Sequence, residues 1–470
     1  MAMAAKLVLI FVFCFAAIIP LLEANSGYDE DGVWKKRKEE AKKSMMESYV
    51  PDPLVVTDEF DVQINQDKGN NGTATHDDDD DGDDDVKEEN KNVSGSVNTT
   101  TNSSRRSLRK KRYTGPCHTT NPIDACWRCR PDWESRRKSL GRCALGFGRR
   151  TNGGMAGKIY VVTDNNDDDL LEPKPGTLRY GVIQKEPLWI TFAKDMNIKL
   201  SQELIMNSNK TIDGRGHKVH IAYGAGITIQ FVSNVIIHGI RIHHICAKGG
   251  GMIRDSPDHY GLRTQSDGDG ITIFGSSNVW IDHVSMSKCG DGLIDAVQGS
   301  TAVTISNCLF TRHNDVMLLG ASDSFAGDQF MQVTVAFNRF GQGLLQRMPR
   351  CRWGFFHVVN NDYTYWKMYA IGGSKHPTII SQGNRFLAPD DIHLKSVTKR
   401  DYAPESEWRN WVWRSEGDLF MNGAFFTQSG QQNMKARPSH EYMIQANPGE
   451  FAARMTRYAG ALECVRGKKC

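Results

Sequence analysis

Short apolar runs separated by polar turns recur along the middle of the chain at a nearly constant interval. Six of them begin at residues 235, 279, 303, 333, 356 and 379, so that consecutive starts lie 44, 24, 30, 23 and 23 residues apart. Each run is rich in β-branched residues and is followed by a turn that contains Gly, Asn or Asp. A period in the low twenties without a helical pattern predicts stacked coils of parallel strands.

We therefore expect an all-β fold, a right-handed single-stranded parallel β-helix, in which residues one period apart are vertical neighbours. A β-sandwich would also give alternating strands, but it would not explain the phased repeat. Asn338, Asn361 and Asn384 fall at one phase of the repeat and predict an asparagine ladder between coils. The same stacking brings distant acidic and basic clusters onto one face of the molecule.

The segments outside the repeat predict a leader, a helix, a linker and a cap. Residues 7–22 are apolar but too few to span a bilayer comfortably, so they indicate a signal peptide and a secreted protein. Residues 33–48 indicate a short surface helix, and the linker that follows has almost nothing to bury. The expected divisions are a signal peptide (1–24), an N-terminal region (25–63), a disordered, acidic, glycosylated linker (64–114), a β-helix domain (115–430) and a C-terminal cap (431–470).

Charge is divided unevenly along the chain. Residues 25–104 hold 21 acidic and 9 basic side chains, whereas the whole chain has a net charge of +3, so the body is basic. A basic body is suited to an acidic partner. Nucleic acid is a poor candidate for a secreted chain without a basic recognition helix, and an anionic polysaccharide is a better one. The aspartate run 77–85 is interpreted as a solvated tail, with calcium collection or mimicry of an acidic substrate as alternatives.

Several features predict processing and modification. The basic run 105–112 resembles a subtilase-type cleavage site that would release the acidic segment, although a solvated basic patch has the same composition. Ten cysteines remain after the signal peptide, an even number that predicts disulfides whose pairing the sequence leaves open. Cys126 and Cys129 are read as structural cysteines rather than a zinc or redox motif, and Cys464 and Cys470 are expected to pin the cap. Glycosylation sequons occur at Asn71, Asn92, Asn98, Asn102 and Asn209.

Four aspartates in two Gly-containing turns form the first candidate site. Asp267 and Asp269 lie in one turn, and Asp291 and Asp295 follow 24 and 28 residues after Asp267, which is about one period. Stacked coils would let both turns converge on one cation, and carboxylate oxygens are the ligands that calcium takes. A single Asp-Gly pair is an ordinary turn, but two pairs at coil spacing favour a metal site.

A cationic cluster, Arg347, Arg350 and Arg352, follows about two coils after Asp295. Pro349 stiffens this segment, and guanidinium groups bind carboxylates with two parallel hydrogen bonds. A set of surface salt bridges would give the same sequence. Next to a calcium site, however, the cluster indicates a binder of a polyanionic sugar chain.

These residues and their surroundings resemble the plant pectate lyases of the parallel β-helix polysaccharide lyase family, close to the flower and pollen type. The resemblance covers about residues 115–440 and extends to the N-terminal helix. The motifs that carry it are GTLRYGVIQ at 176–184, KTIDGRG at 210–216, DGDGITIFGSSNVWIDH at 267–283, QRMPRCRWGFFHVVNNDY at 346–363 and AIGGSKHPTIISQGNRF at 370–386.

The resemblance implies calcium-dependent cleavage of de-esterified galacturonan by β-elimination. It assigns calcium to Asp267, Asp291 and Asp295, with Asp269 adjacent, and it implies that Arg347 is the catalytic base. Substrate binding then falls to Arg352, with Arg350 as an assistant or a holder of the loop. An arginine base predicts an alkaline optimum, because a guanidinium ordinarily keeps its proton.

Two positions need separate interpretation. Asp315 stands where many family members place a lysine that contacts a substrate carboxylate, so it would repel substrate or recruit another calcium ion. His283, in the Trp280–His283 motif, is interpreted as a packing and hydrogen-bonding residue rather than a catalytic one.

Three functions are compatible with this reading. The first is a secreted, monomeric, calcium-dependent pectate lyase of the cell wall. The second is a non-catalytic wall protein, like an allergen, that binds pectate through the same groove. The third is a polygalacturonase-like hydrolase, which needs paired carboxylates with water between them and has no G-H-G or N-T-D motif to support it here.

Overall fold

The structure is a computed structural model, and it describes residues 32–51, 53, 117–400, 403–430 and 441–470. The chain divides into two units, and the smaller one, 58–117, lies outside the described residues except for Cys117. The predicted signal peptide, the predicted acidic linker, the basic run and the first four sequons also lie outside them. Among the described residues, no helix is long and apolar enough to cross a membrane.

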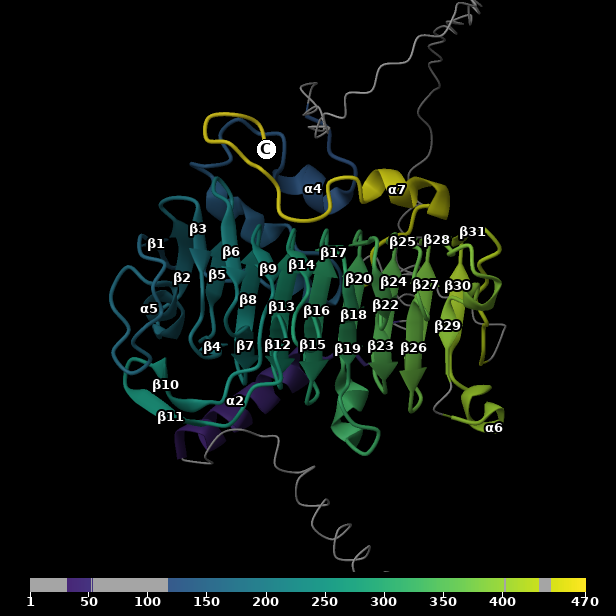
Figure 1. Ribbon diagram of the computed structural model, residues 1–470, viewed down its shortest axis with the longest axis horizontal. Coiled ribbons are helices and arrows are strands. Elements are labelled where there is room, and N and C mark those ends of the chain that lie inside the picture. Colours follow the sequence, from purple (N-terminus) through teal and green to yellow (C-terminus); the bar gives the residue numbers. More distant parts are fainter. Residues whose placement is uncertain (1–31, 52, 54–116, 401–402, 431–440) are drawn as a thin grey trace, which may run out of the picture. The chain divides into compact units, whose positions relative to one another are not determined.

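Three sheets of parallel strands run along the larger unit, and the chain visits each sheet once per coil (Figure 1). The ten-stranded sheet contains, in order, β1 (Lys158–Val162), β2 (Leu188–Phe192), β5 (Lys210–Asp213), β8 (Ser233–His238), β13 (Ser277–Asp282), β16 (Thr301–Ser306), β20 (Gln332–Ala336), β24 (Phe355–Val359), β27 (Thr378–Gln382) and β30 (Trp413–Glu416).

The other two sheets complete each coil. The nine-stranded sheet contains β3 (Met196–Ile198), β6 (Val219–Ala222), β9 (Arg241–His243), β14 (Ser285–Ser287), β17 (Leu309–Phe310), β21 (Arg339–Phe340), β25 (Asp362–Thr364), β28 (Arg385–Leu387) and β31 (Leu419–Met421). The eight-stranded sheet contains β4 (Leu204–Ile205), β7 (Ile227–Gln230), β12 (Ile271–Phe274), β15 (Ile294–Val297), β19 (Met317–Leu319), β23 (Arg350–Arg352), β26 (Ile371–Ser374) and β29 (Thr398–Lys399).

The register confirms the predicted parallel β-helix. Val235, Val279 and Val303, the first residues of three predicted repeats, stand directly beside one another in β8, β13 and β16. Two short pairs lie outside the three sheets. The antiparallel hairpin of β10 (Gly251–Ser256) and β11 (His259–Arg263) interrupts one coil, and β18 (His313–Asp315) pairs in parallel with β22 (Leu344–Gln346).

Vertical stacks of like side chains fill the interior. The predicted asparagine ladder is present, since Nδ2 of Asn338 donates to Oδ1 of Asn361 at 3.0 Å and Nδ2 of Asn361 donates to Oδ1 of Asn384 at 2.9 Å. All three side chains are fully buried, so the ladder satisfies amide groups that would otherwise be costly to bury. An aromatic stack lies on the neighbouring sheet, with ring centroids 4.5–5.6 Å apart, and consists of Phe310, Phe340, Tyr363, Phe386 and Phe420.

Helix α2 (Gly32–Ser48) confirms the predicted N-terminal helix and packs on the β-helix. Its Trp34 is buried against Phe231, and Arg37 forms an ion pair with Asp255 at 2.9 Å. The other helical segments among the described residues are short, namely α4 (Pro122–Trp127), η1 (Arg137–Arg142), η2 (Gly146–Arg150), α5 (Leu178–Ile183), η3 (Ala326–Phe330), η4 (Ile392–Leu394), α6 (Glu405–Trp408), η5 (Gly449–Phe451) and α7 (Ala452–Met455).

The cysteines are partly oxidised. Cys126 pairs with Cys143, and Cys464 pairs with Cys470 within the C-terminal segment. Cys117 and Cys129 are also disulfide-bonded, which supports a structural role for Cys129. Four thiols remain free among the described residues, namely Cys246, Cys289, Cys308 and Cys351.

Candidate active site

The four predicted aspartates occupy neighbouring coils at the eight-stranded sheet. Asp267 and Asp269 lie in the turn before β12, Asp291 lies in the turn before β15, and Asp295 lies within β15. Thr272 of β12 pairs directly with Asp295. The coil spacing inferred from sequence therefore brings these four residues together.

Two of the carboxylates converge on Gly292. Its N–H donates to Oδ1 of Asp269 at 2.8 Å. A Cβ added to Gly292 would lie 2.1 Å from Oδ1 of Asp295 and 3.0 Å from Oδ1 of Asp269, so only glycine fits between them. Oδ2 of Asp269 accepts a hydrogen bond from Thr272 at 3.0 Å, which fixes the orientation of the carboxyl group.

Burial and mutual repulsion raise the pKa values of these groups. Burial, followed by the charges of Asp267 and Asp291, raises the pKa of Asp269 to about 7. Burial and the charges of the other three aspartates raise the pKa of Asp295 well above its usual range. The pKa of Asp267 is also raised, first by burial and then by Asp291. A cation among them would remove this repulsion.

The donor chemistry of this aspartate cluster fits calcium, which takes carboxylate oxygens and water. The side chains are not gathered as a complete ligand set, since no group of three or more His, Cys, Asp or Glu among the described residues is arranged to hold a metal ion. Asp269 is buried, whereas Asp267 and Asp291 are exposed.

Arg347 lies next to Asp315, the residue that departs from the family pattern. Nε of Arg347 is 3.0 Å from Oδ1 of Asp315, and both side chains are about three-quarters buried or more, with exposed fractions of 25% and 20%. The pair forms because Asp315 of β18 stands beside Gln346 of β22, the residue before Arg347. Arg347 has a φ of +61°, an uncommon backbone conformation for a residue with a side chain.

Arg350 and Arg352 lie two residues apart on β23, so they project from the same face of the strand. Arg350 pairs in register with Leu318, which in turn pairs with Asp295, and this places the basic cluster two strands from the aspartates. The side chain of Arg352 is directed to the loop after β19. Its Nε is 2.8 Å from Oδ1 of Asp323, and its NH1 donates to the carbonyl of Gly320 at 2.7 Å.

Sequence reasoning missed Glu203, which lines a small open hollow together with Thr228, Asp267 and Asp269. Oε1 of Glu203 accepts a hydrogen bond from Thr228 at 2.7 Å, and Oε2 is 3.4 Å from NH2 of Arg263. Glu203 stands just before β4, and this is the position in its coil that the aspartate turns occupy before β12 and β15. Only the position of Glu203 before a strand of this sheet could have indicated it. The first coils lack the clear repeat of the later ones, so the sequence does not show that position.

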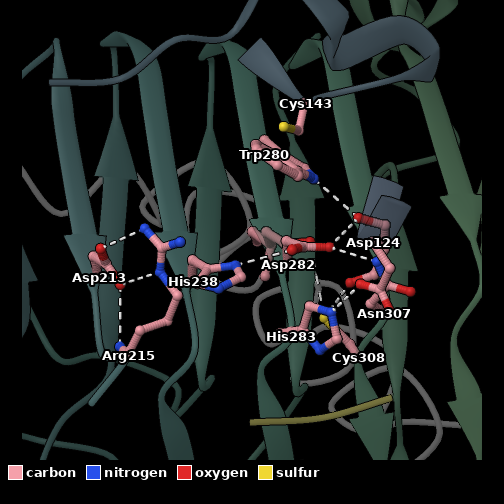
Figure 2. A network of polar contacts seen from close by, with 12 residues as sticks. Asp124, Cys143, Asp213, Arg215, His238, Trp280, Asp282, His283, Asn307 and Cys308 are labelled. Carbon is pink, nitrogen blue, oxygen red and sulfur yellow. Dashed lines mark hydrogen bonds and ion pairs between the residues drawn. The ribbon is translucent and has the colours of Figure 1, made fainter. Parts of the chain in front are cut away.

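The buried polar network around His283 is structural, as the sequence interpretation held (Figure 2). His283 is fully buried, and its Nε2 is 2.7 Å from Oδ1 of Asp124 in α4. Burial alone would lower the pKa of His283, but the carboxylates of Asp124 and Asp282 outweigh it and raise the pKa. His238 makes a similar contact of 2.9 Å with Asp282. Nδ1 of His283 lies 3.0 Å from the carbonyl oxygen of Gly460, so His283 fastens both α4 and the C-terminal segment to the end of β13.

Asn209, the one described sequon, lies in the turn before β5 with a φ of +59°. Its Oδ1 accepts a hydrogen bond from Asn234 at 2.8 Å, and the residue is partly exposed. Glycosylation at this position stays a prediction.

A parallel β-helix with acidic turns beside a basic strand defines a class of proteins suited to anionic polysaccharides. Comparison with known proteins narrows the class. Residues 190–460 match the family model described as pectate lyase, and residues 28–108 match the model described as pectate lyase, N terminus. The chain belongs to the pectate lyase family.

Close relatives extend over nearly the whole chain. The chain is 54% identical to "Probable pectate lyase 7" of Arabidopsis thaliana and 53% identical to "Pectate lyase" of Lilium longiflorum, in each case over 98% of both chains. Among solved structures, it resembles jun a 1, the major allergen from cedar pollen, with a TM-score of 0.71 and 45% identity, covering 73% of this chain and 99% of the other. A thermostable pectate lyase with 21% identity and a TM-score of 0.52 supports the fold alone.

Proposed function

We propose that this protein cleaves pectate, the de-esterified (1→4)-α-D-galacturonan of plant cell walls, by calcium-dependent β-elimination. The products would be oligosaccharides with 4-deoxy-4,5-unsaturated galacturonosyl ends. The observation that carries the proposal is that the aspartate cluster and Arg347 lie at strands of the same sheet, two strands apart, in a chain that belongs to this family. The family and the relatives support lyase activity better than the non-catalytic alternative.

In the proposed mechanism, Asp267, Asp291 and Asp295 hold calcium, with Asp269 beside them. When bound, the ion neutralises the uronate carboxylate and makes the C5 proton more acidic. Arg347 would accept that proton, the C5–H electron pair would form the C4=C5 double bond, and the C4–O bond would break as its oxygen takes a proton from solvent water.

The basic residues have to change partners for this reaction. Arg347 must leave Asp315 and shed its own proton, which supports the expected alkaline optimum. Arg352, proposed to bind a substrate carboxylate, must exchange Asp323 for it, and a bidentate carboxylate of the sugar offers an equivalent partner. Arg350 is proposed to assist it from the same strand face.

We also propose the location and organisation expected from the sequence. A signal peptide over 1–24, secretion to the cell wall, and a single-chain, monomeric enzyme are consistent with the family and with the disulfides. The division at 63, 114 and 430 is proposed on composition, and no nucleic acid or membrane partner is expected.

The test follows the ultraviolet absorbance of the unsaturated product during incubation of the purified protein with polygalacturonate. Activity at alkaline pH that requires calcium and disappears with a chelator is the expected result. Arg347→Lys should remove at least about a hundred-fold of the activity while binding of polygalacturonate persists, the range expected for loss of a proton-transfer group. Retained pectate binding without product at any pH would instead favour the non-catalytic wall protein.

A further inference from the structure

The turns that follow six successive strands of the nine-stranded sheet, β6, β9, β14, β17, β21 and β25, place polar and aromatic side chains at one aligned position. In register, Ala222 stands beside His243, and His243 beside Ser287, so the residues after them also align. The alignment continues through β17, β21 and β25. We call the aligned residues the turn ladder; they are Tyr223, His244, Lys288, Arg312, Gln342 and Tyr365.

The backbone presents most of these side chains in the same way. Tyr223, His244, Lys288, Arg312 and Tyr365 all have φ between +50° and +62°. The same corner therefore recurs in successive coils, and each side chain leaves the chain at an equivalent point. Neighbouring strands lie about 4.8 Å apart, so the six positions span roughly 24 Å parallel to the axis of the β-helix. Figure 1 labels five of the strands that lead into these turns, β6, β9, β14, β17 and β25, in this order.

The turn ladder has aromatic ends and a cationic middle. Tyr223, with 51% of its surface exposed, stacks on His244 with ring centroids 5.1 Å apart and an interplanar angle of 27°. Tyr365 is 41% exposed at the other end. Lys288 and Arg312 are exposed between them, and neither forms an ion pair with another described residue.

His244 is held in place from beneath. Its Nδ1 is 2.9 Å from Nδ1 of His243, whose Nε2 is 2.9 Å from Nδ1 of His220 in the preceding coil. Tyr223 also packs edge-on against His243. The aromatic end is therefore a fixed platform rather than a pair of loose surface rings.

We propose that the turn ladder binds a stretch of anionic polysaccharide beside the proposed catalytic residues, at the start of the turns that lead to Asp291 and Asp315, and anchors the enzyme to polymeric substrate. Aromatic rings suit the apolar faces of sugar rings, and regularly spaced cations suit a chain that carries one carboxylate per sugar. None of the six residues belongs to the proposed catalytic machinery. The inference takes the identity of the polymer from the proposed function.

The test uses the full-length protein and polygalacturonate coupled to beads, with a calcium chelator present. The chelator stops turnover and calcium-bridged binding at the aspartates, so cationic and aromatic contacts dominate. One variant carries Lys288→Gln and Arg312→Gln, and Gln298, with φ +57°, shows that glutamine adopts this backbone here. The second variant is Tyr365→Ala, which leaves the charge unchanged.

A charge-matched control carries Lys158→Gln and Lys194→Gln, two exposed lysines at the ten-stranded sheet. Binding to the beads should weaken about three- to ten-fold in the double variant, which is the scale of two exposed charge contacts. Added salt should weaken the binding of the parent. Tyr365→Ala should also weaken it. The control should bind like the parent, and all variants should cleave a dissolved trigalacturonate at the parental rate when calcium is restored.

Equal binding by the parent and both ladder variants would overturn the inference, as would an equal loss in the control, which would indicate a bulk charge effect. The trimer assay separates the two proposals. A parent that binds the beads through the turn ladder but never cleaves the trimer would contradict the proposed function. The same result would support the turn ladder as a binding surface.

Discussion

Replacing Asp315 with asparagine should raise the catalytic rate, because Asp315 holds the proposed base in an ion pair. The side chain keeps its size and loses only its charge. The distance of 3.0 Å between Nε of Arg347 and Oδ1 of Asp315 is short, and the two side chains are 25% and 20% exposed. Opening this pair is a step that the parent enzyme must take before Arg347 can accept a proton.

The size of the effect follows from the environment of the pair. Fully exposed pairs are worth about 0–1 kcal/mol, and the Coulomb energy at an effective dielectric constant near 20 sets an upper bound of about 5–6 kcal/mol at this separation. The free energy that holds a mostly buried pair with some solvent access falls between these two values, and we take it as about 1–2 kcal/mol. That range corresponds to an increase of about five- to thirty-fold in kcat/KM if opening precedes the chemical step.

The assay is the initial rate of unsaturated product formation at saturating calcium, measured across alkaline pH. Asp258→Asn is the matched control, because Asp258 forms an exposed ion pair with Lys185 at a distance from the site. The control should leave kcat/KM unchanged. A rate for Asp315→Asn that equals or falls below that of the parent would refute the inhibitory pairing, and a higher calcium requirement would identify Asp315 as a calcium ligand instead.

Three other substitutions test separate parts of the structure. Gly292→Ala should weaken calcium binding, measured by calorimetry, about ten-fold or more, because its Cβ would lie 2.1 Å from Oδ1 of Asp295. In the control, Gly290→Ala, the added Cβ meets only ordinary contacts, so this variant should bind calcium normally. Burial raises the pKa of Asp328 to about 6, so the folded state binds the proton more tightly than the unfolded state, and this group costs stability as pH rises from about 4 to about 6. Asp328→Asn should remove up to about 3 kcal/mol of that dependence in denaturant unfolding, and an unchanged pH profile would contradict it. Asn361→Ala should lower the free energy of unfolding by about 2–4 kcal/mol, because the buried amides of Asn338 and Asn384 each lose a hydrogen-bond partner. A loss under about 0.5 kcal/mol would show that the ladder is dispensable.

The fold could be predicted because its strands recur in the sequence at a nearly regular interval. A parallel coil repeats its strand at a fixed interval, so Val235, Val279 and Val303 reveal their register from spacing alone. The asparagine ladder followed from the same phase. The convergence of Asp269 and Asp295 was predictable for this reason too, since their turns differ by about one coil.

Contacts that depend on side-chain direction were not predictable. The pairing of Asp315 with Arg347 requires the additional strands β18 and β22, which lie outside the regular sheets. The engagement of Arg352 with Asp323 depends on the path of a loop between two coils. Glu203 was missed because β4 is two residues long and its coil gives no clear signal. In each case the deciding partner lies in a segment where the repeat is broken.

Helix α2 has a mechanical consequence for the β-helix. A stack of coils gains stability mainly between neighbours, and such arrays can open from one end. Ser44 and Ser48 of α2 bond to Ser277 and Asn278 in β13, while the backbone of Val50 just beyond it exchanges two hydrogen bonds with Gln332 in β20. The helix and the residues after it thus connect coils that are not neighbours. We therefore expect the middle of the molecule to unfold cooperatively as one unit and not one coil at a time.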